Sequence, residues 1–79
     1  MNIRVLFFGA TASVVGQGSM VMQLPEDSIA AGAVDRVTEQ FPDLKKYKLL
    51  CALNQNYVTG NEHLREGDEV AIFTAVSGG

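Results

Sequence analysis

The strongest constraint on the fold is one amphipathic stretch near the middle of the chain. Apolar side chains recur there at spacings of three and four residues: Ala30, Ala33, Val34, Val37 and Phe41. This spacing aligns them along one stripe of an α-helix. We expect Asp27 or Ser28 to cap the start of the helix, and we expect the helix to end at Phe41 because Pro42 disfavours helical geometry in the residue before it. The sequence therefore predicts one main helix that must bury one face.

Strand-like segments precede and follow this helix. Residues 2–8 (NIRVLFF) and 19–24 (SMVMQL) come before it and alternate their side chains as strands do. Residues 48–58 (KLLCALNQNYV), divided by a polar turn at 54–56, and residues 68–73 (DEVAIF) come after it. GATASVVG, between the first two strands, is long enough for one or two helical turns. This order predicts an α+β fold of the β-grasp (ubiquitin-like) type, with the main helix packed on one face of a mixed sheet of about four or five strands.

Length and composition restrict the class of protein. The 79 residues suffice for one domain, which we place at residues 1–73 with a flexible C-terminal tail at residues 74–79. The net charge is −3 and the only basic cluster is Lys45, Lys46 and Lys48, which does not suit a nucleic-acid partner. No apolar stretch reaches the ~20 residues of a membrane span. The single cysteine excludes an internal disulfide and fits a cytoplasmic location.

Side chains suited to catalysis or metal binding are few. The one histidine, His63, falls in a polar loop, where a histidine is usually a surface residue. Cys51 falls in an apolar strand, where a free cysteine usually packs as a small hydrophobic residue. We therefore expect no metal site, no bound cofactor and no catalytic set within the body of the domain.

The segments VLFFGATASVVG, LLCALNQNYV, LREGDEVAIF and VSGG occur in this order along the chain. Together they resemble the small subunit of molybdopterin synthase, a family of ubiquitin-like sulfur carriers. In that family an adenylating enzyme uses ATP to activate the carboxylate of the C-terminal glycine, which then receives sulfur as a thiocarboxylate. The sulfur is passed to cyclic pyranopterin monophosphate during molybdenum cofactor biosynthesis.

The resemblance implies roles for the last residues and implies two protein partners. Gly79 would carry the adenylate and then the sulfur, while Val76, Ser77 and Gly78 would enter the active site of the large, catalytic subunit. The expected assembly is a heterotetramer of two small and two large subunits, and the second partner is the adenylating enzyme. In this scheme the chain donates sulfur and contributes no catalytic side chain of its own. Two glycines suit a narrow slot, because glycine lacks a Cβ and adopts both signs of φ.

Strand alternation also leaves apolar side chains on the sheet face opposite the helix. It assigns Ile3, Val5, Met20, Met22, Val70 and Ile72 to the helix side. Leu6, Phe8 and Phe73 then fall on the other side. Loops would cover them in one interpretation; in our preferred one they form the docking surface for the large subunit, because exposed apolar clusters often mark interfaces.

Two other functions remain open from the sequence. A sulfur carrier for thiamine thiazole synthesis shares several of these motifs, although it is usually shorter. A ubiquitin-like modifier would begin with the same adenylate and end in an isopeptide bond to a lysine. A free thiocarboxylate would distinguish either carrier from a modifier.

Overall fold

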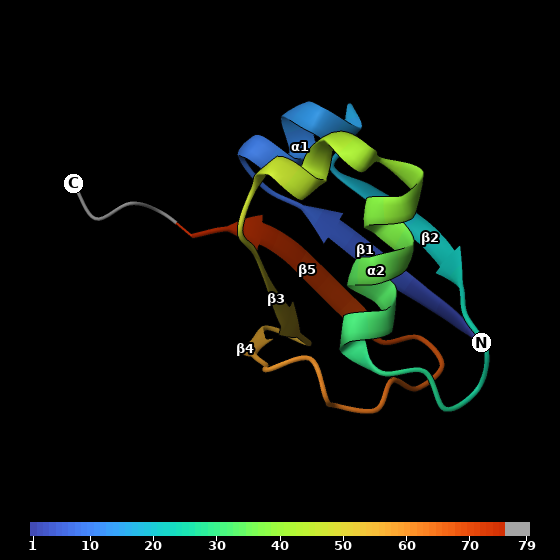
Figure 1. The fold of residues 1–79 in the computed structure, drawn as a ribbon. Helices are drawn as coiled ribbons and strands as arrows, with labels where there is room; N and C mark the ends of the chain where they lie inside the picture. Colours follow the sequence, from blue (N-terminus) through green and yellow to red (C-terminus); the bar gives the residue numbers. More distant parts are fainter. Residues whose placement is uncertain (76–79) are drawn as a thin grey trace.

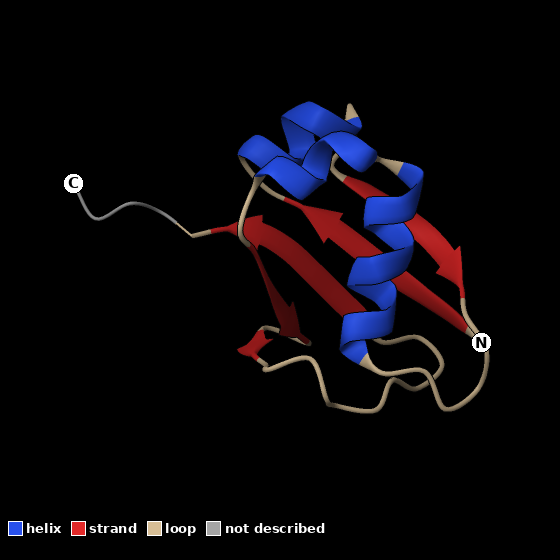
Figure 2. Cartoon of the chain, viewed as in Figure 1, coloured by secondary structure: helices blue, strands red, loops and turns tan. Residues whose placement is uncertain are grey.

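The computed structural model describes residues 1–75, which form one sheet with helices packed on one of its faces (Figure 1, Figure 2). The strands are β1 (Asn2–Phe7), β2 (Ser19–Gln23), β3 (Leu49–Leu53), β4 (Asn56–Tyr57) and β5 (Glu69–Thr74). The helices are α1 (Ala10–Val15), α2 (Ala30–Gln40) and the 3₁₀ helix η1 (Pro42–Lys46).

The five strands lie in the order β2-β1-β5-β3-β4. β1 and β5 pair in parallel at the centre of the sheet, whereas the β1–β2, β3–β5 and β3–β4 pairs are antiparallel. This arrangement confirms the predicted β-grasp fold with a mixed sheet and one main helix. β5 extends to Thr74, which pairs with Leu49, so the sheet includes the first residue of the segment that we expected to be tail.

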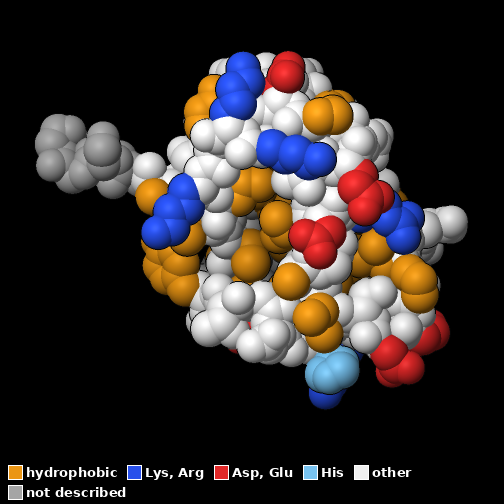
Figure 3. All heavy atoms as spheres, in the orientation of Figure 1, with side chains coloured by type: hydrophobic (Ala, Val, Ile, Leu, Met, Phe, Trp, Pro, Cys, Tyr) orange, Lys and Arg blue, Asp and Glu red, His pale blue; other side chains and the backbone are white. Residues whose placement is uncertain are grey.

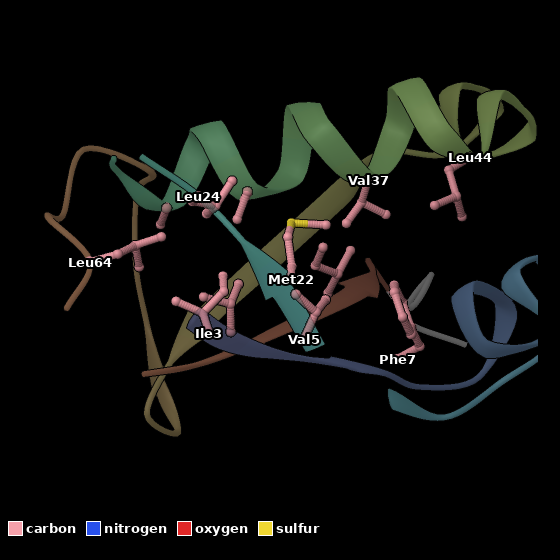
Figure 4. Packing of buried hydrophobic residues seen from close by; sticks show 12 residues of the cluster. Ile3, Val5, Phe7, Met22, Leu24, Val37, Leu44 and Leu64 are labelled. Carbon is pink, nitrogen blue, oxygen red and sulfur yellow. The ribbon is translucent and has the colours of Figure 1, made fainter. Parts of the chain in front are cut away.

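The core lies between the sheet and α2 (Figure 4). Alternation along β1 buries Ile3, Val5 and Phe7, and the paired strands add Met22, Val70 and Ile72 on the same side. Met20 also packs against this core and is half-buried. The set predicted to face the helix is therefore confirmed.

The helix contributes the small side chains of the predicted stripe. Ala30, Ala33 and Val37 are fully buried, and Phe41 follows the last helical residue with a φ of −126°, as the proline after it requires. Leu44 of η1 and Leu64 of the loop before β5 close the two ends of the core. Small residues on the helix allow it to lie close to the sheet.

The cap predicted for α2 was wrong. Asp27 has a φ of 69°, and the Ser28 hydroxyl donates to the Pro25 carbonyl at 2.6 Å. The helix begins at Ala30 after Ile29, whose side chain offers no acceptor. The first N–H groups of α2 must therefore find acceptors elsewhere.

The loop at residues 59–64 supplies those acceptors. The Glu62 carbonyl accepts from the Ala30 N–H and the Gly60 carbonyl from the Ala31 N–H, both at 2.9 Å. Gly60 has a φ of +112°, and a Cβ there would lie 3.2 Å from the Ala31 Cβ, so the close approach requires glycine. The helix is thus capped by a segment about thirty positions away in the sequence.

The side chain of Glu62 holds this loop in shape. Its carboxylate accepts from the Gly60 N–H at 2.9 Å and from the Thr59 N–H at 3.2 Å. Burial favours a higher pKa for this carboxyl, but the hydrogen bonds from Thr59 and Gly60 outweigh it and leave the pKa below its usual value.

Candidate functional site

The candidate site is the face of the sheet that the helices leave open. Leu6 of β1 pairs with Ala71 of β5, and Phe73 of β5 pairs with Leu50 of β3. Leu6 and Phe73 are half-buried, while Phe8, just after β1, is 54% exposed. The structure therefore places the three predicted residues on the expected face, and no helix covers Phe8.

An apolar groove of about 430 Å³ lies on this face. Its lining comes from β3, β4, β5 and the residues just after β1, and it includes Phe8, Ala52, Tyr57, Ala71, Phe73 and Thr74. The rings of Tyr57 and Phe73 meet edge to face, with centroids 5.7 Å apart and planes at 65°. Phe8 and Phe73 thus share one groove, whereas Leu6 lies beside it in the sheet.

The corner between β1 and α1 fixes the position of Phe8. Gly9 has a φ of 56° and a ψ of −123°, a conformation that side chains with a Cβ rarely adopt. Thr11, fully buried, accepts a hydrogen bond at its Oγ1 from the Phe8 N–H at 3.0 Å. The same hydroxyl lies 2.8 Å from the Ile72 carbonyl, to which it donates.

This Thr11 hydroxyl replaces one rung of the β1–β5 ladder. The Arg4 N–H donates to the Asp68 carbonyl at 2.9 Å, and a regular parallel ladder repeats that pattern every two residues. The Phe8 N–H would therefore donate to the Ile72 carbonyl, but the Thr11 hydroxyl stands between them. α1 is tied in this way to the end of the sheet that carries the groove.

A tight turn fixes Tyr57 on the other side of the groove. Asn54 and Gln55 have φ values of 48° and 73°, so the β3–β4 hairpin turns through two positive-φ residues. The Asn54 side chain accepts from the Glu69 N–H at 3.0 Å and donates to the Asp68 carboxylate at 3.1 Å. The turn is therefore anchored to the start of β5, and Tyr57, 82% exposed, projects beside the groove.

The groove lies next to the point where the chain leaves the sheet. Thr74 is both the last residue of β5 and part of the groove lining. The predicted tail residues Val76, Ser77, Gly78 and Gly79 lie outside the described residues. Their roles stay predictions.

The described residues offer little other chemistry. Cys51 of β3 is half-buried against the core, and burial, with a smaller contribution from the negative charge of Glu62, raises the pKa of its thiol. His63 is exposed, and its backbone forms an isolated bridge with Ile29. Within residues 1–75, no three His, Cys, Asp or Glu side chains gather where they could hold a metal ion.

The helical face carries a mixed surface. Acidic, basic and apolar side chains alternate over it without a field of one sign (Figure 3). None of the helices in the described part of the chain combines the length and apolar character that a membrane span requires.

Sequence reasoning missed Thr11 and Tyr57 as parts of this site. Thr11 stands in a short apolar stretch that gives no local sign of its contact with Ile72, 61 positions away. Tyr57 follows a strand and a polar turn, and the alternation of that hairpin could have placed it on the face of Ala52, its partner in the ladder.

Comparison with known proteins agrees with this architecture. The model of the ThiS family matches residues 5–79. The molybdopterin synthase sulfur carrier subunit of Haemophilus influenzae is 37% identical, over 98% of this chain and 99% of its own length.

Two solved structures share the fold. SAMP1 from Haloferax volcanii has a TM-score of 0.86 at 22% identity, with all of both chains covered. The complex of subunits 1 and 2 of the molybdopterin-converting factor from Helicobacter pylori contains a chain with a TM-score of 0.70 at 22% identity, again with full coverage. At these identities the structures establish the fold alone. The family model and the close relative go further: this chain belongs to the ThiS family, together with the molybdopterin synthase sulfur carrier subunits.

Proposed function

We propose that this chain is the sulfur-carrying small subunit of a molybdopterin synthase, that it acts in the cytoplasm, and that the carboxyl group of Gly79 carries the sulfur. The observation that carries the proposal is an apolar groove beside the start of the C-terminal segment, which ends in Gly-Gly. A protein that hands over a group from its end needs a docking surface near the base of that end. The relative from Haemophilus influenzae, matched over its whole length, supports the same role.

The chemistry begins at the Gly79 carboxylate. One carboxylate oxygen attacks the α-phosphorus of ATP in the adenylating enzyme, and pyrophosphate leaves. A hydrosulfide ion then attacks the acyl carbon and displaces AMP, which leaves a thiocarboxylate. If a persulfide delivers the sulfur instead, an acyl disulfide forms as AMP leaves, and a second thiol attacks its S–S bond, which releases the thiocarboxylate and leaves a disulfide between the donor and that thiol. Glycine leaves the acyl carbon unhindered at both steps, since it has no Cβ.

The tail delivers the sulfur to the large subunit. The sheet ends at Thr74, and an extended chain spans about 3.3 Å per residue, so residues 75–79 reach at most about 17 Å beyond the sheet. Val76, Ser77 and Gly78 would occupy the channel while cyclic pyranopterin monophosphate accepts the sulfur from Gly79. The domain at residues 1–73 positions the tail, and it supplies no catalytic side chain.

The large subunit docks on the outer face of the sheet. Phe8 and Tyr57 are exposed aromatic side chains beside Phe73, and aromatic anchors dominate binding energy at many interfaces. The Helicobacter pylori structure is a complex of two subunits of a molybdopterin-converting factor, which supports a partner of this kind. We expect two copies of each subunit in the assembly.

Replacement of Phe8 tests the docking surface. Because the side chain is more than half exposed, Phe8→Ala leaves the core intact, and loss of the anchor weakens binding to the large subunit by about 2 kcal/mol, or roughly thirtyfold. Val21→Ala is the matched control, since Val21 is 71% exposed on the same face but lies on β2, away from the groove. Isothermal titration calorimetry with the large subunit measures the affinity of both variants. Equal affinities for Phe8→Ala and wild type would refute the docking surface.

A reconstitution tests the function. The carrier is incubated with its adenylating enzyme, ATP and a sulfur donor, and the large subunit and cyclic pyranopterin monophosphate are added. Formation of molybdopterin is the expected result. Isopeptide adducts on lysines instead would indicate a modifier, and transfer of sulfur only to a thiazole synthase would indicate the thiamine pathway.

A further inference from the structure

β2 forms one edge of the sheet, and its outer side is unpaired among the described residues (Figure 1). Met1 and Leu24 exchange two backbone hydrogen bonds, at 2.7 and 2.9 Å, and the Phe7 N–H donates to Gly18 at 2.9 Å. In an antiparallel ladder these bonded positions alternate. The backbone N–H and C=O groups of residues 18, 20, 22 and 24 therefore point toward β1. Those of Ser19, Val21 and Gln23 point outward from the edge.

This edge lacks the usual protection. Exposed edge strands commonly carry lysine, another charge or an internal proline, which discourages pairing with other strands. Residues 16–24 (GQGSMVMQL) contain no charged residue and no proline. The opposite edge, β4, is only two residues long and is protected by its shortness.

The edge sequence is nearly symmetric about Val21. Methionine stands on both sides of it, and uncharged polar residues, Ser19 and Gln23, stand one position farther out. The three positions whose backbone groups point outward, 19, 21 and 23, are therefore placed symmetrically about Val21 as well. A strand of this kind is complementary to itself when a second copy approaches antiparallel, with a two-fold axis at Val21.

We propose that β2 pairs with β2 of a second copy of this chain, so that two sheets join into one. Val21 would stand opposite Val21 of the second copy, and Ser19 opposite its Gln23. Six backbone hydrogen bonds would form, two for each facing pair. Met20 of one copy would face Met22 of the other on the helix side, where Met20 is only half-buried in the single chain.

Charge does not oppose this pairing. The nearest charged side chain in the sheet is Arg4, which pairs with Val21 one strand inward. With strands about 4.8 Å apart, the two copies of Arg4 would lie about 14 Å from each other across the join. That exceeds the screening length of about 8 Å at physiological salt.

The pairing is independent of the proposed sulfur transfer. The groove lies on β5, β3 and β4 and on the end of β1, so a pair of chains joined at β2 leaves it accessible. A five-residue strand pair buries a small area, which corresponds to weak association. The pair should therefore form only at high protein concentration.

Sedimentation equilibrium over a wide concentration range tests the proposal. The average mass should rise from 8.5 kDa toward twice that value as the concentration increases. Val21→Pro removes an outward N–H that makes no bond to β1, so it should abolish association without loss of the fold. Phe8→Ala, on the groove, should associate like the wild type.

Charges placed at the two outer positions test the register. In the protein that combines Ser19→Lys with Gln23→Glu, the lysine of each copy faces the glutamate of the other. These two pairs of opposite charge should tighten association roughly three- to tenfold. Ser19→Lys combined with Gln23→Lys sets like charges there and should leave only single chains. Single chains at every concentration of wild type, or association unchanged by Val21→Pro, would overturn the proposal.

Discussion

Replacement of Thr11 by valine should destabilise the domain well beyond what the small change in shape suggests. Valine has nearly the same volume as threonine but has no hydroxyl. Thr11 is fully buried, and its hydroxyl accepts from the Phe8 N–H and donates to the Ile72 carbonyl, at 3.0 and 2.8 Å. The substitution removes the bridge at the end of the β1–β5 ladder.

The expected cost follows from which groups lose a partner. The Phe8 carbonyl also lies 2.9 Å from the Thr11 hydroxyl, but it keeps a bond from the Thr11 N–H at 3.2 Å, so it is little affected. The partly buried Phe8 N–H and the buried Ile72 carbonyl each lose the hydroxyl, and an unsatisfied buried group costs about 1–3 kcal/mol. One additional buried methyl group offsets part of this cost. We therefore expect the free energy of unfolding to fall by about 2 kcal/mol, which lowers Tm by roughly 10 °C for a domain of this size.

Urea denaturation followed by circular dichroism measures this loss. Thr38→Val is the matched control, because its hydroxyl donates only to the Asp35 carbonyl of its own helix, at 2.9 Å in an exposed setting, and it should cost less than about 0.5 kcal/mol. Thr11→Ser keeps the bridge and should recover most of the stability. If Thr11→Val unfolds at the same urea concentration as the wild type, the bridge does not hold α1 to the sheet.

Two further predictions concern Cys51 and Glu62. Cys51→Ala should cost about 1 kcal/mol of stability, from lost packing, and should leave sulfur transfer intact; a well-folded variant that no longer gains sulfur would contradict the structural role. Because burial raises the pKa of this thiol, iodoacetamide should modify Cys51 at pH 8 more slowly than a cysteine at exposed position 19 in a Ser19→Cys, Cys51→Ala protein. Glu62→Gln should lower Tm at neutral pH, since the amide cannot accept both loop N–H groups. The pKa of Glu62 is lowered in the folded state, so its contribution is present above the ordinary value of 4.5 and is lost as the pH falls through the folded-state pKa. The Tm difference between wild type and Glu62→Gln should therefore shrink as the pH falls below 4.5; a difference independent of pH would refute this role of the charge.

The elements with a local signal were predictable from the sequence. The stripe on α2, the alternation in β1 and β5 and the turn after β3 each depend on residues close together in the chain. Gly67, in the polar turn before β5, has a positive φ of 82°, and Leu64, an apolar residue in an otherwise polar loop, is buried. Such features follow from periodicity and from turn chemistry.

The features that the sequence concealed are contacts between distant segments. The cap of α2 is formed by the carbonyls of Gly60 and Glu62, which no local pattern before Ala30 could indicate. The groove likewise needs Phe8, Tyr57 and Phe73 to be brought together by strand order. Alternation put Phe8 and Phe73 on the correct face, but it could not show that they share a groove at the base of the C-terminal segment.

The most direct test of the central claim is mass spectrometry of a protein that lacks Gly79. Wild-type protein, treated with adenylating enzyme, ATP and a sulfur donor, should gain the mass difference of one oxygen replaced by sulfur. Deletion of Gly79 shortens the reach by about 3.5 Å, and a misplacement of even 1 Å can cost about a hundredfold in rate. The shortened protein should keep its Tm, because the sheet ends at Thr74, and it should show no gain in mass. Conversion of the shortened protein at the wild-type rate would show that Gly79 does not carry the sulfur.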